Sequence, residues 1–293
     1  MSDSTRLPPQ MGDPPVSGRC PRRVGRVAGA TTQPVGRWIR FADLPREPLR
    51  LFFPAATLAG LIGVGLWPVM LLGWTENYPG PSHARLMVQG FFGGFVIGFM
   101  GTAMPRLVEA PPLSARAVGS LLALFFGNVI ANTLGLNPLA DGIFAGELAL
   151  LFSLLKRRCH SSRALPPPSF VLVGLAFASA LAGTALHLAG RCWPLSEPLE
   201  LLARLLSYHA FVLLCVLGAG GFLLPRFLGL GVRRKFPESD GPSPEWKRPA
   251  RVAKAAGAFI LLTYAWEAAG WNRLAGTARA AACIAYLACE MPV

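Results

Sequence analysis

Long apolar runs separated by short polar stretches make up most of the chain after residue 50. A helix needs about 20 apolar residues to cross a hydrocarbon core of about 30 Å, and the runs approach this length. The last run is the weakest, because it is short, rich in alanine and contains Arg279. The pattern predicts an all-α fold, a polytopic transmembrane helix bundle of about eight spans. The predicted segments are 51–74, 84–105, 117–136, 139–155, 169–190, 206–228, 253–271 and 274–291.

The composition supports a membrane protein. Hydrophobic residues make up 53% of the 293 positions and charged residues 15%, with a mean hydropathy of +0.45. Soluble domains carry about 25% charged residues, so the sequence indicates an integral protein of the lipid bilayer. The net charge of +13 does not indicate a nucleic-acid partner, because the basic residues collect in alternate loops and not on one helix face.

The distribution of the basic residues predicts the orientation. Cytoplasmic loops of membrane proteins carry the excess of Lys and Arg. With the N-terminus inside, 23 of the 28 basic residues lie on the cytoplasmic side. The five on the outer side are Arg85, Arg191, Arg204, Arg273 and Arg279. We therefore expect both termini in the cytoplasm.

The polar segments divide the chain into regions. Residues 1–49 are rich in Arg, Pro and Gly and contain no apolar stretch typical of a secretory signal, so they are predicted to be a disordered, basic cytoplasmic tail. Residues 50–293 form the predicted transmembrane helical domain. Within it, 231–252 is polar and rich in proline and is expected to be a long cytoplasmic loop.

Ionisable side chains inside the predicted spans concentrate in the outer half of the bilayer. Such groups are costly in lipid and are usually functional. Their common depth predicts one polar site near the outer face. Each also has a structural interpretation: a histidine at a helix end can reach the headgroups, and the glutamates can pair with Arg279, Arg273 or the asparagines to hold helices together. The ionisable residues concerned are His83, His187, His209, Glu147 and Glu267, and the polar Asn132 lies at the same predicted depth.

The stretch from His83 to Arg106 has an unusual helical face. At 100° per residue one side presents His83 and Met87, followed by small residues only, namely Gly90, Gly94, Gly98 and Gly101. The glycines either pack against a neighbouring helix or form a flat groove for a porphyrin, with His83 or Met87 as a metal ligand. The segment 206–228 also begins near a histidine, His209, and ends in Pro-Arg, so we expect the two helices to contribute matching ends to one site.

Two sequence blocks resemble the NnrS family of bacterial membrane proteins. The family block His-Ala-His-Glu-Met, with its closing Gly-Phe-Leu-x-Thr-Ala-x-Pro, is similar to residues 83–87 and 98–105 here. A second block, His-Ala followed by Met-x-Arg and Leu-Gly, is similar to 209–210, 224–226 and 228–229. Arg85 and Leu86 replace the family's second histidine and glutamate, Leu224 replaces its methionine, and the chain is shorter than a typical member.

The resemblance implies a protein that binds haem and/or copper near the outer face and is linked to nitric oxide and nitrosative stress. The expected ligands are His83 and His209, with Met87 and His187 in reserve, since imidazole and thioether suit copper and haem iron. Arg85, Glu147, Glu267 and Asn132 are expected to orient the ligands or a haem propionate.

Other functions stay open at this point. A small-solute or proton transporter or channel is one alternative, and a non-catalytic membrane scaffold is the other. No hydrolase or transferase motif is present, which leaves a redox role open. A membrane redox partner or a homo-oligomer is also compatible with the sequence.

Overall fold

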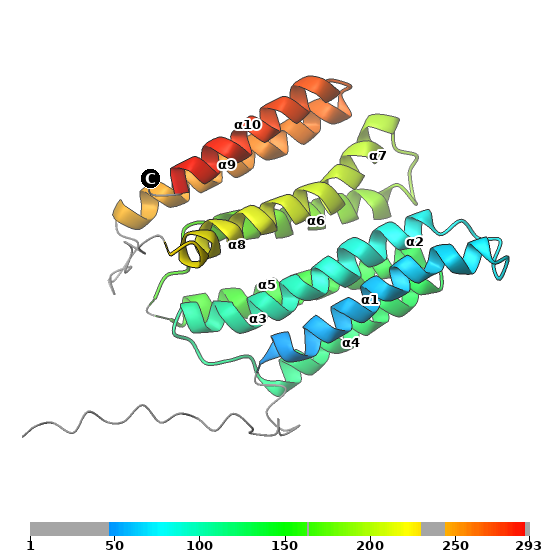
Figure 1. Cartoon of the computed structure of the whole chain (residues 1–293), viewed down its shortest axis with the longest axis horizontal. Coiled ribbons are helices and arrows are strands. Elements are labelled where there is room, and N and C mark those ends of the chain that lie inside the picture. Colours follow the sequence, from blue (N-terminus) through cyan, green and yellow to red (C-terminus); the bar gives the residue numbers. More distant parts are fainter. Residues whose placement is uncertain (1–46, 163, 230–243, 291–293) are drawn as a thin grey trace, which may run out of the picture. The chain divides into compact units, whose positions relative to one another are not determined.

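The computed structural model describes residues 47–162, 164–229 and 244–290, and the regular structure of these residues is entirely helical (Figure 1). Most of the predicted tail, residues 1–46, lies outside the described part. Two of the helices are short π-helical segments that continue directly from one α-helix into the next. The elements are α1 (Pro48–Leu71), α2 (Gly80–Arg85), η2 (Leu86–Phe92), α3 (Gly93–Leu107), α4 (Ala115–Thr133), α5 (Asn137–His160), α6 (Phe170–Ala189), α7 (Glu197–Arg204), η3 (Leu205–Ala210), α8 (Phe211–Phe227), α9 (Pro244–Ala268) and α10 (Asn272–Glu290).

All eight predicted segments are helical, but they are not equally suited to a membrane. Six helices of the described part are long and apolar enough to cross a bilayer: α1, the continuous α2–η2–α3, α4, α5, α6 and the continuous α7–η3–α8. The helices α9 and α10 are not among them. The first turns of α9 carry Lys247, Arg248, Arg251 and Lys254. The loop predicted at 231–252 is wrong over 244–252, because α9 already begins at Pro244, where the fixed φ of proline suits a first helical position. The rest of that loop, 230–243, lies outside the described residues.

The helices repeat one arrangement in two halves, α1–α5 and α6–α10. In each half a long helix packs along the helix that contains the π segment, α1 along η2 and α3, and α6 along η3 and α8. A pair of adjacent helices then follows, α4 with α5 and α9 with α10 (Figure 1). The halves meet where α5 packs on α6 and where the Phe211 ring lies 5.7 Å from Phe92 and 5.8 Å from Phe144.

Close contacts at glycines set the register of this repeat. Gly63 of α1 packs against Leu86 in η2, and Gly183 of α6 packs against Ser207 in η3. Further along, Gly98 packs against Phe53, and Gly218 packs against Val173. In this last pair of contacts, Gly218 lies 120 positions after Gly98, and Val173 lies 120 positions after Phe53.

This register corrects the predicted equivalence of the two histidines. His83 lies in α2, before the π segment, whereas His209 lies within η3. With the offset of 120, or the 121 that relates Leu86 to Ser207, His209 corresponds to Gln89 or Val88, and His83 corresponds to Ala203 or Arg204. The two imidazoles therefore do not occupy matching positions.

The glycine face of the 83–106 helix is filled by α1. A Cβ added at Gly90 would lie 3.1 Å from the Cβ of Ala59, and one added at Gly94 would lie 2.8 Å from the Cβ of Ala56. Gly98 and Gly101 meet Phe52 and Pro48 of the same helix. Glycine allows two backbones to approach this closely in a membrane. The face is therefore occupied by protein and leaves no room for a porphyrin.

We expect Gly94→Ala to lower the free energy of unfolding by roughly 1–3 kcal/mol, because the added methyl group would overlap Ala56 and the Phe125 ring. Thermal unfolding of the detergent-purified protein measures the change. Gly174→Ala is the matched control: it lies in α6 with nothing within 4 Å of an added Cβ, so it should be neutral or stabilising. Equal melting temperatures for the two variants would contradict the tight α1–α3 contact.

Candidate functional site

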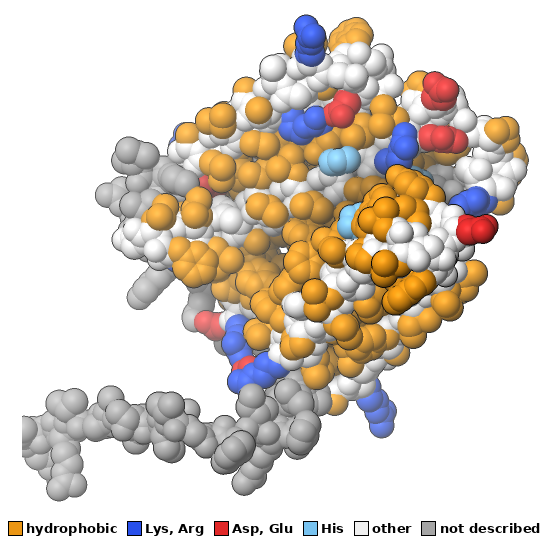
Figure 2. Space-filling view, turned by 45° about the vertical axis from the view of Figure 1, so that its right-hand side comes forward, with side chains coloured by type: hydrophobic (Ala, Val, Ile, Leu, Met, Phe, Trp, Pro, Cys, Tyr) orange, Lys and Arg blue, Asp and Glu red, His pale blue; other side chains and the backbone are white. Residues whose placement is uncertain are grey.

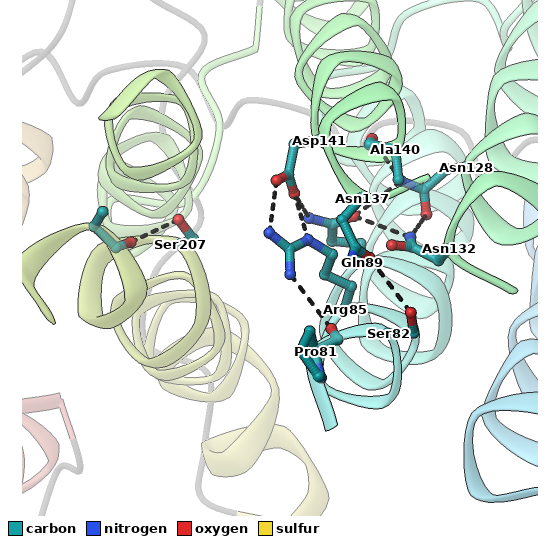
Figure 3. Close-up of polar contacts among 11 residues, drawn as sticks. Pro81, Ser82, Arg85, Gln89, Asn128, Asn132, Asn137, Ala140, Asp141 and Ser207 are labelled. Carbon is teal, nitrogen blue, oxygen red and sulfur yellow. Dashed lines mark hydrogen bonds and ion pairs between the residues drawn. The ribbon is translucent and has the colours of Figure 1, made fainter. Parts of the chain in front are cut away.

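A buried ion pair joins the continuous helix α2–η2–α3 to α5. The guanidinium of Arg85 donates from Nε to Oδ1 of Asp141 at 2.9 Å and from Nη2 to Oδ2 at 2.8 Å (Figure 3). Arg85 is 9% exposed and Asp141 2%. Parallel double hydrogen bonds of this kind are among the stronger polar contacts in proteins. They account for a charge pair that is otherwise costly to bury.

Amide side chains extend this ion pair into a network. Gln89 donates to Oδ1 of Asp141 at 2.8 Å, and its own carbonyl accepts from Asn128 at 2.9 Å and from Asn132 at 3.3 Å. Asn128 also donates to the backbone carbonyl of Ala140 at 2.9 Å (Figure 3). The network therefore ties η2, α4 and α5 together. We call Arg85, Asp141, Gln89, Asn128 and Asn132 the buried polar network.

A cavity of about 260 Å³ opens beside this network, between the two halves. The first half contributes Arg85 and Asp141 to its wall. The second half contributes side chains from the end of α6, the following connection and α7. Those are His187, Arg191, Glu200 and Arg204. Figure 2 shows basic, acidic and histidine side chains among hydrophobic ones on one face of the molecule.

His187 occupies a distinctive place in this cavity. Its ring stacks on Tyr208 with the centroids 6.0 Å apart. Its Nε2 is buried and has no hydrogen-bond partner among the described residues. Sequence reasoning placed His187 among the reserve ligands, and the structure places it with Arg85 in one cavity.

The other predicted ligands lie elsewhere. His83 is turned toward α1, where its Nδ1 lies 2.9 Å from the backbone carbonyl of Gly63 and its ring lies edge-on to Trp67. The sulfur of Met87 also packs beside Gly63. His209 is exposed, and the described residues provide no polar contact for it. The structure thus brings His83 and Met87 to the same glycine and does not join His209 to them.

The two glutamates differ from each other. Glu267 pairs with Arg279, whose guanidinium lies 4.0 Å from the centre of the Tyr264 ring, so it holds α9 to α10 as one of the sequence interpretations expected. Glu147 is fully buried, and neither of its oxygens has a hydrogen-bond partner among the described residues. The pairing predicted for Glu147 is therefore wrong. No group of three or more His, Cys, Asp or Glu side chains in the described part is placed to hold a metal ion.

Sequence reasoning missed the partners of Arg85. Asp141, Gln89 and Tyr208 are absent from the predicted site. One signal was available: a cation within a span requires a partner, and Asp141 is the acid at the start of α5 on the same predicted side of the membrane. Tyr208 gave no comparable signal, because its contact with His187 depends on the π-helical register of η3.

Taken together, the apolar helices, the buried polar network and the polar cavity define a polytopic membrane protein of the helix-bundle class. The chain matches the family described as NnrS protein over residues 43–291, which is most of its length, and it belongs to that family. No curated protein and no solved structure matches it.

Breaking the buried ion pair should destabilise the fold. We expect Asp141→Leu to cost about 3–5 kcal/mol, because it leaves the guanidinium of Arg85 buried without its counter-charge. The double variant Arg85→Met with Asp141→Leu should recover most of that loss. Thermal unfolding in one detergent measures all three proteins, and a double variant as unstable as Asp141→Leu would contradict the argument.

Glu147 gives the opposite expectation. An unpartnered carboxyl group in an apolar interior is itself a cost, so Glu147→Gln and Glu147→Leu should leave the melting temperature unchanged or raise it. The same thermal assay serves, with the paired Glu267→Gln as the destabilised comparison. A drop of several degrees in Glu147→Leu alone would show that this carboxyl group has a stabilising partner.

Proposed function

We propose that this NnrS-type membrane protein binds copper, and haem in addition where haem is available, at His83, and that it serves in the response to nitric oxide or nitrosative stress. The single observation that carries the proposal is the contact between His83 and Gly63. A backbone carbonyl only accepts hydrogen bonds, so Nδ1 of His83 carries the proton and Nε2 keeps a free lone pair. Metal-binding histidines are typically held in this way by their second nitrogen.

The donors beside Gly63 suit copper better than a porphyrin. Imidazole nitrogen and thioether sulfur, from His83 and Met87, are the soft neutral donors that Cu(I) prefers. A porphyrin on the glycine face does not fit, because α1 fills that face along Ala59 and Ala56. A haem bound by His83 would therefore have to approach from another side.

A bound copper ion would supply one-electron chemistry and an open position for a small ligand such as nitric oxide. The protein's own part is to hold the donors. The Gly63 carbonyl fixes the tautomer and the ring plane of His83, and Trp67, whose ring centre lies 5.8 Å from that of His83, restricts its rotation. Under the expected orientation this site faces the outer side of a bacterial inner membrane, with the N-terminus in the cytoplasm. A membrane redox partner or a second copy of the chain would then reach it from the bilayer.

The test is metal analysis and the visible spectrum of the detergent-purified protein. We expect His83→Ala to lower the copper content, and any Soret absorbance, at least tenfold, because the ligand with the free lone pair is removed. Met87→Leu should weaken copper binding and leave any haem signal in place, since the thioether is replaced by an apolar group of similar size.

His160→Ala is the matched control, because His160 is an exposed histidine at the opposite end of α5 from Asp141. It should retain the wild-type metal content. His209→Ala decides whether the exposed histidine contributes a ligand. A wild-type protein that stays free of copper and haem after supply of both, or a His83→Ala variant with unchanged content, would overturn the proposed function.

A further inference from the structure

Three arginines line the cavity between the halves, and among the described residues only Arg85 is paired with a carboxylate. The charge of Arg85 is matched by Asp141 through two hydrogen bonds. The side chains of Arg191 and Arg204, both exposed, make no hydrogen bond or ion pair with the described residues. Glu200 lies one helical turn before Arg204 on α7 but forms no ion pair with it.

The histidine of the cavity adds a second, independent indication. Nε2 of His187 is buried with no partner among the described residues, although His187 lines an open polar cavity. Buried polar atoms in proteins are nearly always hydrogen-bonded, so an unpartnered one calls for a bound water or ligand. The ring of His187 and two exposed arginine side chains without a described partner thus line the same cavity.

We propose that this cavity is a binding site for a compact oxyanion or carboxylate. Guanidinium groups bind planar and tetrahedral oxyanions through charge-assisted hydrogen bonds, often in pairs. Arg191 and Arg204 bind the anion, and the imidazole ring of His187 donates the remaining hydrogen bond. Arg85 is a positioning residue: held by Asp141, it forms a fixed cationic wall that the ligand faces.

The dimensions and surroundings limit the ligand. A volume of about 260 Å³ equals roughly eight to nine water molecules at about 30 Å³ each, which admits a small acid or inorganic oxyanion. Leu188 and Leu195 complete the wall with apolar surface. The carboxylate of Glu200 repels a bound anion and therefore lowers the affinity of the cavity for it.

The site is distinct from the metal site, because His83 is turned to α1 and does not line this cavity. A free small anion and a haem propionate both offer negatively charged oxygen atoms to the arginines. The experiment therefore compares both sources.

Isothermal titration of the full-length protein in detergent, at constant ionic strength set with chloride, uses acetate, nitrate, sulfate and phosphate as probes. We expect saturable binding of at least one of them, weakened about tenfold or more in Arg204→Gln and in Arg191→Gln and strengthened in Glu200→Gln. Arg273→Gln is the matched control: it removes the same charge from an exposed arginine of α10 that does not line the cavity. It should bind as the wild type does, and so should His83→Ala.

A second titration uses haemin and haemin dimethyl ester, which differ only in their free propionates. If Arg204→Gln weakens haemin but not the ester, the source is a propionate; if it weakens the free anions, the source is a small acid or oxyanion. Absence of saturable binding for all probes, or an Arg273→Gln effect equal to that of Arg204→Gln, overturns the proposal. Loss of copper in His83→Ala with intact anion binding separates this site from the proposed function.

Discussion

The ion pair between Arg85 and Asp141 is the contact on which the rest of this structure depends. A lone guanidinium or carboxylate in the interior of a bundle would cost several kcal/mol, so the two helices that carry them are held in one relative position. Gln89 donates a further hydrogen bond to Asp141. Its side-chain carbonyl accepts hydrogen bonds from Asn128 and Asn132, so α4 is held in place as well. Three elements of the first half are therefore fixed by polar geometry as well as by apolar packing.

The same constraint separates two chemical environments on one helix. His83 and Arg85 are two residues apart, so on a helix they point about 200° away from each other. His83 contacts Gly63 of α1, whereas Arg85 contacts α5 and the cavity. One side of the helix thus presents an uncharged imidazole and thioether, and the other side presents a fixed cation between the two halves.

Much of this architecture could be predicted from the sequence. Apolar runs located every long helix but missed α7 and most of α2. The spacing of Gly90, Gly94 and Gly98 identified a face that packs closely on a neighbour, although it left a porphyrin as the alternative. The spacing could not name α1 as that neighbour, because nothing local in the sequence selects a partner. For the same reason the sequence did not identify the partner of Arg85, which is Asp141, 56 positions later.

The π-helices explain another group of errors. Assigning faces at 100° per residue assumes an unbroken α-helix, and a π segment changes the rotation per residue. The segment at Leu205–Ala210 interrupts the α-helical spacing in this way, and there His209 is exposed while its neighbour Tyr208 stacks on His187. Across Leu86–Phe92 the predicted face stays together, because His83, Met87 and the glycines all contact α1. The predicted count of eight spans is not confirmed, because α9 and α10 are regular helices whose charged turns and alanines make them less apolar than the six candidate spans.

The two departures from the family block act on opposite sides of the same helix. Leu86 stands where the family block has glutamate; it is fully buried and its Cβ lies 3.1 Å from the position of a Cβ added at Gly63. A carboxylate is thus missing beside His83, and the donors that remain there, imidazole and thioether, carry no charge. A neutral donor pair in a low-dielectric setting compensates a monovalent cation better than a divalent one, because less charge must be buried without a counter-ion. Arg85, where the block has histidine, adds a permanent charge on the cavity side. Under the two proposals above, Cu(I) would bind on one side of the helix and an anion on the other, and the direction of each side chain from the helix keeps the two apart.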